Sequence, residues 1–257
     1  RREIKTCSDD SLSFEYMFLL CKKGENMIKF EEVSKIYQNG NKKIYALNKV
    51  SFTINKGEFV IILGPSGARK STLLNILGGI DRLDEGKIII DNEVISNKNE
   101  NELSDYRAHQ VGFIFQFYNL IPTLTVYENV ALMKELKKDI MPVDNVLDQV
   151  GLLVHKKKFP HQLSGGEQQR VSIARAVVKN PEILLCDEPT GALDSDTGAK
   201  VLKLLHDMCK EYHKTTIIVT HNTNLQAIAD KVIRVKNGQI NTITTNSHPL
   251  DVMEVEW

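Results

Sequence analysis

The segment "EFVIILGPSGARKSTLLNILGG" (residues 58–79) gives the clearest indication of the fold, because it predicts a strand, a loop and a helix in succession. Its first six residues form a short apolar run that ends at Gly-Pro, which is typical of a buried strand. After the loop, Leu73, Leu74 and Leu77 recur at helical spacing and share one face. A loop between a strand and a helix can direct backbone N–H groups and the positive helix end at phosphates. The segment therefore predicts a phosphate-binding site in an α/β domain.

One residue of the loop "GPSGARKS" (residues 64–71) departs from the pattern Gly, four residues, Gly, Lys, Ser or Thr. Gly64, Lys70 and Ser71 match, but Arg69 stands where the second glycine is required. In this pattern the lysine neutralises phosphate charge and the hydroxyl binds Mg²⁺. If φ at this position is positive, a residue other than glycine costs about 1–2 kcal/mol. We therefore expect Arg69 to weaken nucleotide binding, although its guanidinium could also reach a phosphate.

Composition excludes several other classes of protein. The chain has 257 residues, with 33 basic and 33 acidic side chains, so its charge gives no indication of a nucleic-acid partner. Its longest apolar runs are far shorter than the roughly 20 residues that a membrane-spanning helix needs. The cysteines are widely spaced, which suits a reducing cytosol rather than a disulfide framework. They are Cys7, Cys21, Cys186 and Cys209.

Short apolar runs and helical patterns alternate along the chain from Met27 onward. This alternation predicts a largely parallel sheet covered by helices. Strands are expected at residues 27–37, 58–63, 86–90, 111–115, 182–187 and 215–220, and helices at 126–136, 144–150 and 167–177. We expect one domain over residues 27–257, with a small helical insert at about 117–178.

The two ends of the chain look different from this domain. Residues 1–26 are interpreted as a non-native or flexible extension, with Met27 as the natural start, because Lys22–Glu25 would be encoded by a purine-rich stretch like a ribosome-binding site. The final "DVMEVEW" (residues 251–257) is expected to be a frayed acidic tail, and "HKKKF" (residues 155–159) a solvated surface.

Further polar side chains follow two of the predicted strands. "ILLCDEPT" (residues 183–190) brings Asp187 and Glu188 to the carboxyl edge of the sheet, where open α/β sheets bind ligands. Asp187 could hold Mg²⁺, and Glu188 could polarise an attacking water as a general base. His221 follows "TTIIVT" and faces the same edge. Each signal is weak alone, because acidic pairs after strands are common and a lone histidine is usually structural.

The segment "LSGGEQQR" (residues 163–170) begins a predicted helix. Its backbone N–H groups and the Ser164 hydroxyl could bind a phosphate at the helix start. Alternatively, Ser164 and Glu167 form a plain N-terminal capping box.

Together and in this order, these segments closely resemble the ATPase subunit of ABC transporters, over about residues 27–241. "GPSGARKS" is similar to the Walker A loop, "ILLCDE" to Walker B with its catalytic glutamate, and "LSGGEQQR" to the ABC signature. Gln116 in "GFIFQFYNL" resembles the Q-loop glutamine, Asp194 in "GALD" the D-loop aspartate, and His221 the switch histidine. Tyr37 in "KIYQNG" lies where the family stacks an aromatic ring on adenine.

The resemblance implies a role for each of these residues. Glu188, His221 and Gln116 would be catalytic, and Ser71, Gln116 and Asp187 would hold Mg²⁺. ATP would be bound by Tyr37, Gly64, Pro65, Ser66, Gly67, Ala68, Arg69, Lys70, Ser71 and Thr72. The ATP of a partner subunit would be contacted by the signature residues Leu163, Ser164, Gly165, Gly166 and Glu167.

The resemblance also implies an architecture and partners. The fold would be a P-loop NTPase core of class α/β, with a mostly parallel sheet, an antiparallel β subdomain and a small helical insert. The chain would form an ATP-dependent head-to-tail dimer, with Ser164 of one subunit capping the γ-phosphate at Lys70 of the other. A separate transmembrane permease would hold this dimer at the cytoplasmic face of the membrane.

The segments "FYNLIPTLTVYENV" and "EPTGALDS" resemble the subgroup for macrolide and peptide efflux and lipoprotein release. This subgroup implies export of a peptide, an antibiotic or a lipid-linked substrate. Chromosome-organising relatives are disfavoured, because the stretch between Lys70 and Ser164 holds no coiled-coil heptads. The alternative is a nonhydrolytic nucleotide-binding module that regulates a membrane partner, which Arg69 would favour.

Overall fold

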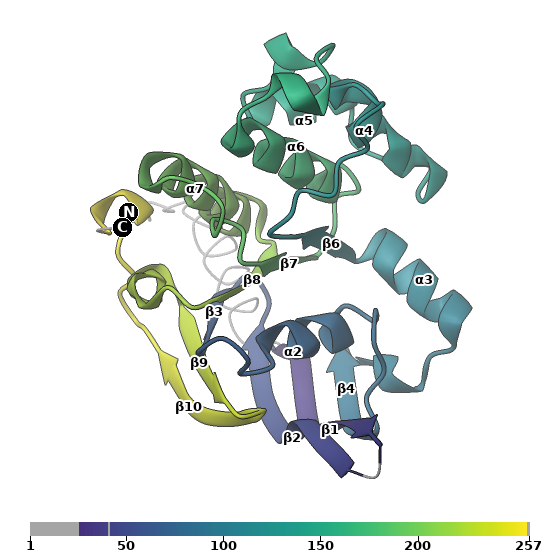
Figure 1. Ribbon diagram of the computed structural model, residues 1–257, viewed down its shortest axis with the longest axis vertical. Coiled ribbons are helices and arrows are strands. Elements are labelled where there is room, and N and C mark those ends of the chain that lie inside the picture. Colours follow the sequence, from purple (N-terminus) through teal and green to yellow (C-terminus); the bar gives the residue numbers. More distant parts are fainter. Residues whose placement is uncertain (1–25, 41, 256–257) are drawn as a thin grey trace, which may run out of the picture.

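The computed structural model describes residues 26–40 and 42–255, which form two β-sheets with helices around them (Figure 1). The predicted extension, residues 1–26, lies outside the described residues except for Asn26. In the part that is described, no helix is both long enough and apolar enough to cross a membrane.

The larger sheet has the strand order β10-β9-β3-β8-β7-β6. All neighbours from β9 to β6 are parallel, and β10 adds an antiparallel strand at the edge. The central strands β3 and β8 are buried along their whole length, as an apolar run covered on both faces requires. The strands are β3 (Phe59–Leu63), β6 (Val111–Ile114), β7 (Ile183–Asp187), β8 (Thr215–Thr220), β9 (Lys231–Lys236) and β10 (Gln239–Thr245). The carboxyl ends of the parallel strands share one edge, and the predicted phosphate loop, Gln116, Asp187, Glu188 and His221 follow them there.

The smaller sheet is antiparallel, with the strand order β2-β1-β4-β5. Its inner face and the helix α2 (Lys70–Leu77) contribute to one hydrophobic core, to which α2 adds Leu73, Leu74, Ile76 and Leu77. Figure 1 shows α2 lying over this sheet. The strands are β1 (Asn26–Asn39), β2 (Lys42–Asn55), β4 (Glu85–Ile90) and β5 (Glu93–Val94).

Between β6 and β7 the chain is helical, and in Figure 1 this helical region projects away from the antiparallel sheet. Its elements are α4 (Val126–Ala131), η2 (Leu132–Glu135), α5 (Val143–Gln149), η3 (Leu153–His155), η4 (Pro160–Gln162) and α6 (Gly165–Val177). The predicted helix at 126–136 is an α-helical turn and a half that continues as a 3₁₀ segment. The other helical elements are η1 (Ile95–Asn97), α3 (Glu100–His109), α7 (Ser195–Tyr212), η5 (Thr223–Ile228) and η6 (Val252–Glu254).

The segment before the C-terminus packs onto the core. Val252 and Val255 are buried in the same hydrophobic cluster as residues of α7. The expectation of a frayed tail is therefore wrong for residues 251–255, because two valines three residues apart lie on one side of a short 3₁₀ turn. Residues 256–257 lie outside the described part.

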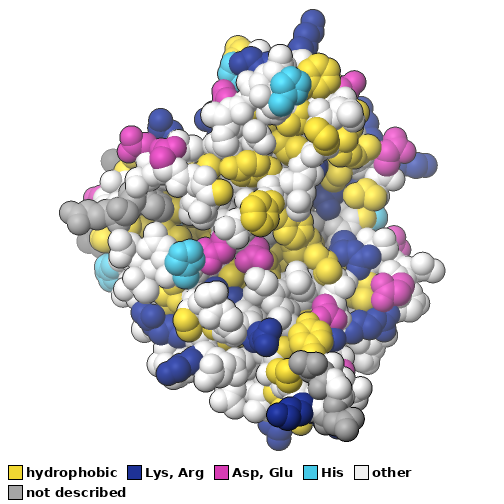
Figure 2. All heavy atoms as spheres, in the orientation of Figure 1, with side chains coloured by type: hydrophobic (Ala, Val, Ile, Leu, Met, Phe, Trp, Pro, Cys, Tyr) yellow, Lys and Arg dark blue, Asp and Glu magenta, His cyan; other side chains and the backbone are white. Residues whose placement is uncertain are grey.

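Figure 2 shows acidic side chains beside a histidine near the centre of one face, where Figure 1 places β7 and β8. Hydrophobic side chains extend from there toward the helical region. This face contains the carboxyl edge of the large sheet.

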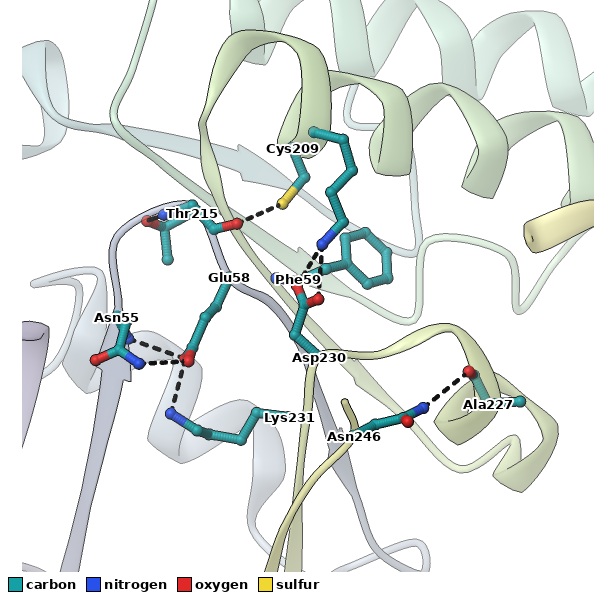
Figure 3. Close-up of polar contacts among 11 residues, drawn as sticks. Asn55, Glu58, Phe59, Cys209, Thr215, Ala227, Asp230, Lys231 and Asn246 are labelled. Atoms are coloured by element: carbon teal, nitrogen blue, oxygen red, sulfur yellow. Dashed lines mark hydrogen bonds and ion pairs between the residues drawn. The ribbon is translucent and has the colours of Figure 1, made fainter. Parts of the chain in front are cut away.

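At the opposite, amino edge of the large sheet, Glu58 joins three strands (Figure 3). Its Oε2 accepts from Lys231 Nζ at 2.7 Å and from the Asn55 backbone N–H at 2.9 Å. Lys231 Nζ also donates to the Thr53 carbonyl at 3.0 Å. The Lys231 and Glu58 side chains are only 9% and 15% exposed, so this is a sheltered ion pair.

Asp230 makes a second junction beside it (Figure 3). Its Oδ2 accepts from the Phe59 backbone N–H at 2.7 Å and from Lys210 Nζ at 2.6 Å. These contacts fix the start of β3 to the start of β9 and to α7.

Candidate active site

The loop between β3 and α2 holds Arg69 in a strained conformation. Arg69 precedes α2 with φ 72° and ψ 27°, the left-handed region, and makes no side-chain cap of the helix. Gly67 also has positive φ, 78°. An L-residue in this region costs about 1–2 kcal/mol. The structure therefore gives the positive φ at which the replacement of glycine by arginine is unfavourable.

Lys70 follows as the first residue of α2, and its side chain crosses the loop. Its Nζ donates to the carbonyls of Gly64 at 2.8 Å and Pro65 at 3.2 Å. The residue is only 8% exposed. A sheltered ammonium therefore lies at the helix N-terminus, where the helix dipole also favours an anion.

The loop and three strand ends surround a cleft of about 530 Å³. This volume is in the range of small-molecule sites, roughly 300–1,000 Å³. The residues that line the cleft are Ser66, Gly67, Ala68, Arg69, Lys70, Ser71, Thr72, Gln116, Asp187, Glu188 and His221. The structure thus brings together the predicted phosphate loop, Q-loop glutamine, acidic pair and histidine, from four separate segments.

Asp187 is the last residue of β7 and lines this cleft. Burial raises the pKa of its carboxyl, the Glu188 charge raises it further, and a hydrogen bond with Ser71 and the charge of Lys70 act against this. The Ser71 hydroxyl, the Asp187 carboxylate and the Gln116 amide supply oxygen donors, the ligands that Mg²⁺ prefers. All three residues line the same cleft, so their oxygen donors fit a magnesium ion.

Glu188 is held from two sides by β8 and the residue after it. The Nδ1 atom of His221 lies 2.9 Å from Glu188 Oε1, and Thr220 Oγ1 donates to Oε2 at 3.2 Å. The Glu188 side chain is 16% exposed and that of His221 is 69% exposed. Glu188 also has positive φ, 48°, and its N–H donates to the Val219 carbonyl at 2.9 Å. A sheltered carboxylate with two fixed partners is suited to hold a water molecule in one orientation.

Thr220 was not among the predicted site residues. The sequence placed it at the end of a strand next to His221, but a threonine in a β-branched run is ordinary strand composition. Only the pairing of β7 with β8 shows that its hydroxyl meets Glu188.

Tyr37 lies on β1, outside the residues that line the cleft. Its hydroxyl donates to Asp81 Oδ2 at 2.7 Å, while Lys35 Nζ donates to Asp81 Oδ1 at 2.8 Å. Burial and the Asp81 contact raise the pKa of the Tyr37 hydroxyl, and a hydrogen bond with Thr72 opposes this. Tyr37 therefore reaches the first turn of α2, and Asp81, which the sequence did not single out, orients it.

The predicted signature residues lie at the start of α6 and do not line the cleft. Ser164 precedes the helix: its Oγ accepts from the Glu167 N–H at 3.3 Å, and its own N–H donates to Glu167 Oε2 at 2.7 Å. The capping box that the sequence allowed is therefore present, with Ser164 exposed. Asp194 likewise caps α7 by accepting from the Thr197 N–H at 3.0 Å. The two helix starts touch, because a Cβ on Gly166 would lie 2.0 Å from Thr197 Cγ2.

Residues 47–191 match the family described as ABC transporter. The chain belongs to this family. The uncharacterized ABC transporter ATP-binding protein MJ0796 of Methanocaldococcus jannaschii is 44% identical over 223 residues, which are 83% of this chain and 95% of that protein. The macrolide export ATP-binding/permease protein MacB of Mannheimia succiniciproducens is 42% identical over 230 residues, 88% of this chain but only 36% of that protein.

Solved ABC cassettes share the fold. The dimeric post-hydrolysis structure of MJ0796 bound to ADP and Pi aligns with a TM-score of 0.78 and 42% identity, covering 85% of this chain and 98% of that one. The structure of cbiO1 from Clostridium perfringens, part of the ABC transporter complex cbiONQ, aligns with a TM-score of 0.75 and 31% identity, covering 86% and 89%. The predicted fold class and the predicted family are thereby confirmed.

The geometry of this ABC cassette divides the predicted residues into two groups. The residues predicted as the phosphate loop, acidic pair, Q-loop glutamine and switch histidine line one cleft, and Tyr37 contacts Thr72 of α2 from outside that lining. The signature and Asp194 form a second group at the adjoining starts of α6 and α7.

Proposed function

We propose that this chain is the ATP-hydrolysing subunit of an ABC transporter and drives a separate membrane permease. The observation that carries the proposal is the contact of Glu188 with His221 and Thr220 in the same cleft as Lys70 and Ser71. A binding module has no need for a general base oriented in this way, whereas hydrolysis does.

The residues divide the work of hydrolysis between them. Lys70 and the N–H groups at the start of α2 bind the phosphates, and Glu188 takes a proton from the attacking water. His221 holds the Glu188 carboxylate. Mg²⁺, held by Ser71, Gln116 and Asp187, would neutralise charge on the phosphate oxygens.

The working form is proposed to be a head-to-tail dimer. The exposed start of α6 offers the Ser164 hydroxyl and a positive helix end, but it does not line this chain's own cleft. A second subunit would supply the phosphate, bound at its own Lys70. The dimeric structure of MJ0796 with ADP and Pi supports this arrangement.

The proposed partner is a permease, which would hold the chain on the inner face of the cell membrane. MacB is named as an ATP-binding and permease protein, and this chain matches about a third of it. We infer that the same division of labour is carried here by two chains, with export of a peptide, an antibiotic or a lipid-linked substrate.

Arg69 is proposed to lower the affinity for ATP without removing the activity. Its left-handed backbone places a Cβ and a long side chain at the phosphate loop, where the family has glycine. The alternative function, a nonhydrolytic nucleotide-binding module, is favoured by Arg69 alone, whereas the Glu188–His221 contact favours hydrolysis.

The test combines two substitutions. In an Arg69→Gly background, Glu188→Gln should lower the rate of ATP hydrolysis by about 10²–10⁴-fold, because an amide cannot accept the proton of water. With hydrolysis blocked, ATP should convert monomers to dimers in light scattering after gel filtration. ADP should leave monomers, since it lacks the γ-phosphate that joins the two subunits.

Ser164→Arg is the control for the dimer. It should abolish dimerisation while each monomer still binds ATP at its own loop. Equal dimerisation with ATP, ADP and neither would refute the head-to-tail arrangement, and a loss of hydrolysis below tenfold would refute the role of Glu188.

A further inference from the structure

Glu167 of the signature is bound on both of its carboxylate oxygens. Oε2 accepts from the Ser164 N–H at 2.7 Å, and Oε1 lies 3.2 Å from His155 Nε2. The side chains of His155 and Glu167 are 27% and 21% exposed. His155 is therefore connected to the signature serine through one carboxylate.

The capping boxes of α3 and α4 provide a comparison. In them Asn99 pairs with Glu102, and Thr125 pairs with Glu128, by the same reciprocal bonds. Glu128 Oε2 accepts one hydrogen bond from the Thr125 backbone N–H and another from the Thr125 hydroxyl. Among the described residues, Glu167 of α6 is the capping-box glutamate that also contacts a histidine, His155.

The backbone around His155 is fixed. The His155 N–H donates to the Leu152 carbonyl, and the His155 carbonyl accepts from Lys158, each at 2.9 Å. The next residues are tied to α4, since the Val126 N–H donates to the Lys158 carbonyl at 2.8 Å. The imidazole is thus presented to Glu167 by a braced turn.

The charge of Glu167 matters for the proposed dimer. Its carboxylate lies at the start of α6, where the phosphate of a partner subunit would bind, and two anions at one helix start repel each other. The pKa of Glu167 is lowered, mainly by the Ser164 N–H, so the carboxylate stays charged near neutral pH. A protonated imidazole on Oε1 would counter that charge and hold the carboxylate in the box.

We propose that His155 is a positioning residue for the signature serine, and that its protonation tightens the ATP-dependent dimer. This inference rests on the proposed function, because Ser164 must contact the partner's nucleotide. Histidine is the side chain whose charge ordinarily changes near neutral pH, so the dimer should be tighter at pH 6.5 than at pH 8.

Other charged groups belong to the same segments as the pair. Lys156 pairs with Asp144 of α5 at 2.9 Å, and the Lys158 charge helps to lower the pKa of Glu167. Arg170 of α6 lies by Gly151, in the turn before η3. These cations form a constant background, whereas His155 supplies the contribution that varies with pH.

The experiment uses the full chain with Arg69→Gly and Glu188→Gln as the parent. The dimer dissociation constant is measured by sedimentation with saturating Mg-ATP at pH 6.5 and pH 8. In the parent, the dimer dissociation constant should be lower at pH 6.5 than at pH 8. His155→Gln should reduce the ratio of these two constants by about two- to fivefold, the range expected for a partly exposed ion pair. His155→Lys, with a permanent charge, should keep the dimer tight at pH 8.

His161→Gln is the matched control. His161 lies six residues further on, is exposed, and stacks on Phe159 instead. It should keep the parent profile, because its ring stacks on Phe159.

A His155→Gln profile identical to that of His161→Gln would overturn the inference and leave the dimer itself intact. A His155→Lys protein with the pH dependence of the parent would overturn it as well. A parent that stays monomeric with ATP would instead refute the proposed dimer, and the role of His155 with it. Melting temperatures of the variants separate these results from a loss of folding.

Discussion

The two edges of the six-stranded sheet differ in how they hold charged side chains. At the carboxyl edge, Arg69 and Glu188 both have positive φ, and burial raises the pKa of the Asp187 carboxyl. At the amino edge, the carboxylates of Glu58 and Asp230 accept from lysines and from backbone N–H groups (Figure 3). The carboxyl edge holds a carboxyl whose charged form is disfavoured by burial, and the amino edge pairs its carboxylates with cations and N–H groups.

This difference is what a binding site in a stable fold requires. Strained and poorly solvated groups are usual where a ligand must be held, and the surrounding structure must compensate for them. The same strands carry both edges, so stability gained at one end of β3 offsets strain at the other. Substitutions at the amino edge should therefore change stability, and substitutions at the carboxyl edge should change nucleotide binding.

The largest expected effect on stability comes from breaking the amino-edge pair. Lys231→Met leaves the sheltered Glu58 carboxylate without its cation and should lower the free energy of unfolding by about 3–5 kcal/mol. Urea denaturation measures this, and calorimetric titration should find ATP affinity unchanged in the folded protein.

A double variant provides the control. Glu58→Gln combined with Lys231→Met removes both charges and should recover much of the lost stability, because no buried ion is left unpaired. A Lys231→Met protein of normal stability would show that the ion pair does not join the strands, and reduced ATP affinity would show that the two edges are coupled.

A smaller effect is expected at Arg69. Arg69→Gly should relieve about 1–2 kcal/mol of backbone strain, less about 0.5–1 kcal/mol for the greater freedom of glycine in the unfolded chain. It should also raise ATP affinity, because the Arg69 side chain no longer crowds the phosphates. The strain itself counts once, in the folding stability, since the loop already holds this backbone in the structure. Urea denaturation and calorimetric titration measure the two quantities separately.

His213 is a matched residue at the other edge. It ends α7 just before β8, with φ 53° and ψ 33°, so it has the same left-handed backbone as Arg69. His213→Gly should therefore give a similar gain in stability with no change in ATP affinity. Equal affinities for Arg69 and Arg69→Gly proteins would mean that the loop accommodates the arginine.

The contrast between the edges also explains what the sequence could predict. The cleft residues follow strand ends within short motifs, so Lys70, Asp187, Glu188 and His221 could each be found from a few neighbouring residues. Their meeting follows from the parallel sheet, since the carboxyl ends of its strands share an edge. The site residues of the cleft were therefore predictable as a group.

The amino edge carries no such local signal. Glu58 and Lys231 are 173 positions apart, and Phe59 and Asp230 are 171 apart. In the sequence alone, Glu58, Asp230 and Lys231 therefore look like ordinary surface residues. The strands β2, β9 and β10 were missed for a related reason: they mix charged and polar residues with apolar ones, and their pairing depends on distant partners. Val252 and Val255 were misread because their burial depends on α7.

The smallest expected effect is on the stability of two Asp→Asn variants, at Asp187 of the carboxyl edge and at Asp230 of the amino edge. Because burial raises the pKa of Asp187, folding disfavours its charged form, and this penalty is present at pH 7 and lost as pH falls through the raised pKa. Asp187→Asn should therefore unfold at a slightly higher urea concentration than the parent at pH 7, and the gap should narrow as the pH is lowered. The amide can still accept from Ser71, so no hydrogen bond need be lost. Asp230→Asn should do the opposite and destabilise at pH 7, because it removes the charge that Lys210 pairs with at 2.6 Å. If Asp187→Asn destabilised the protein as Asp230→Asn does, Asp187 would be a structural acceptor, and the two edges would not differ in the way their geometry indicates.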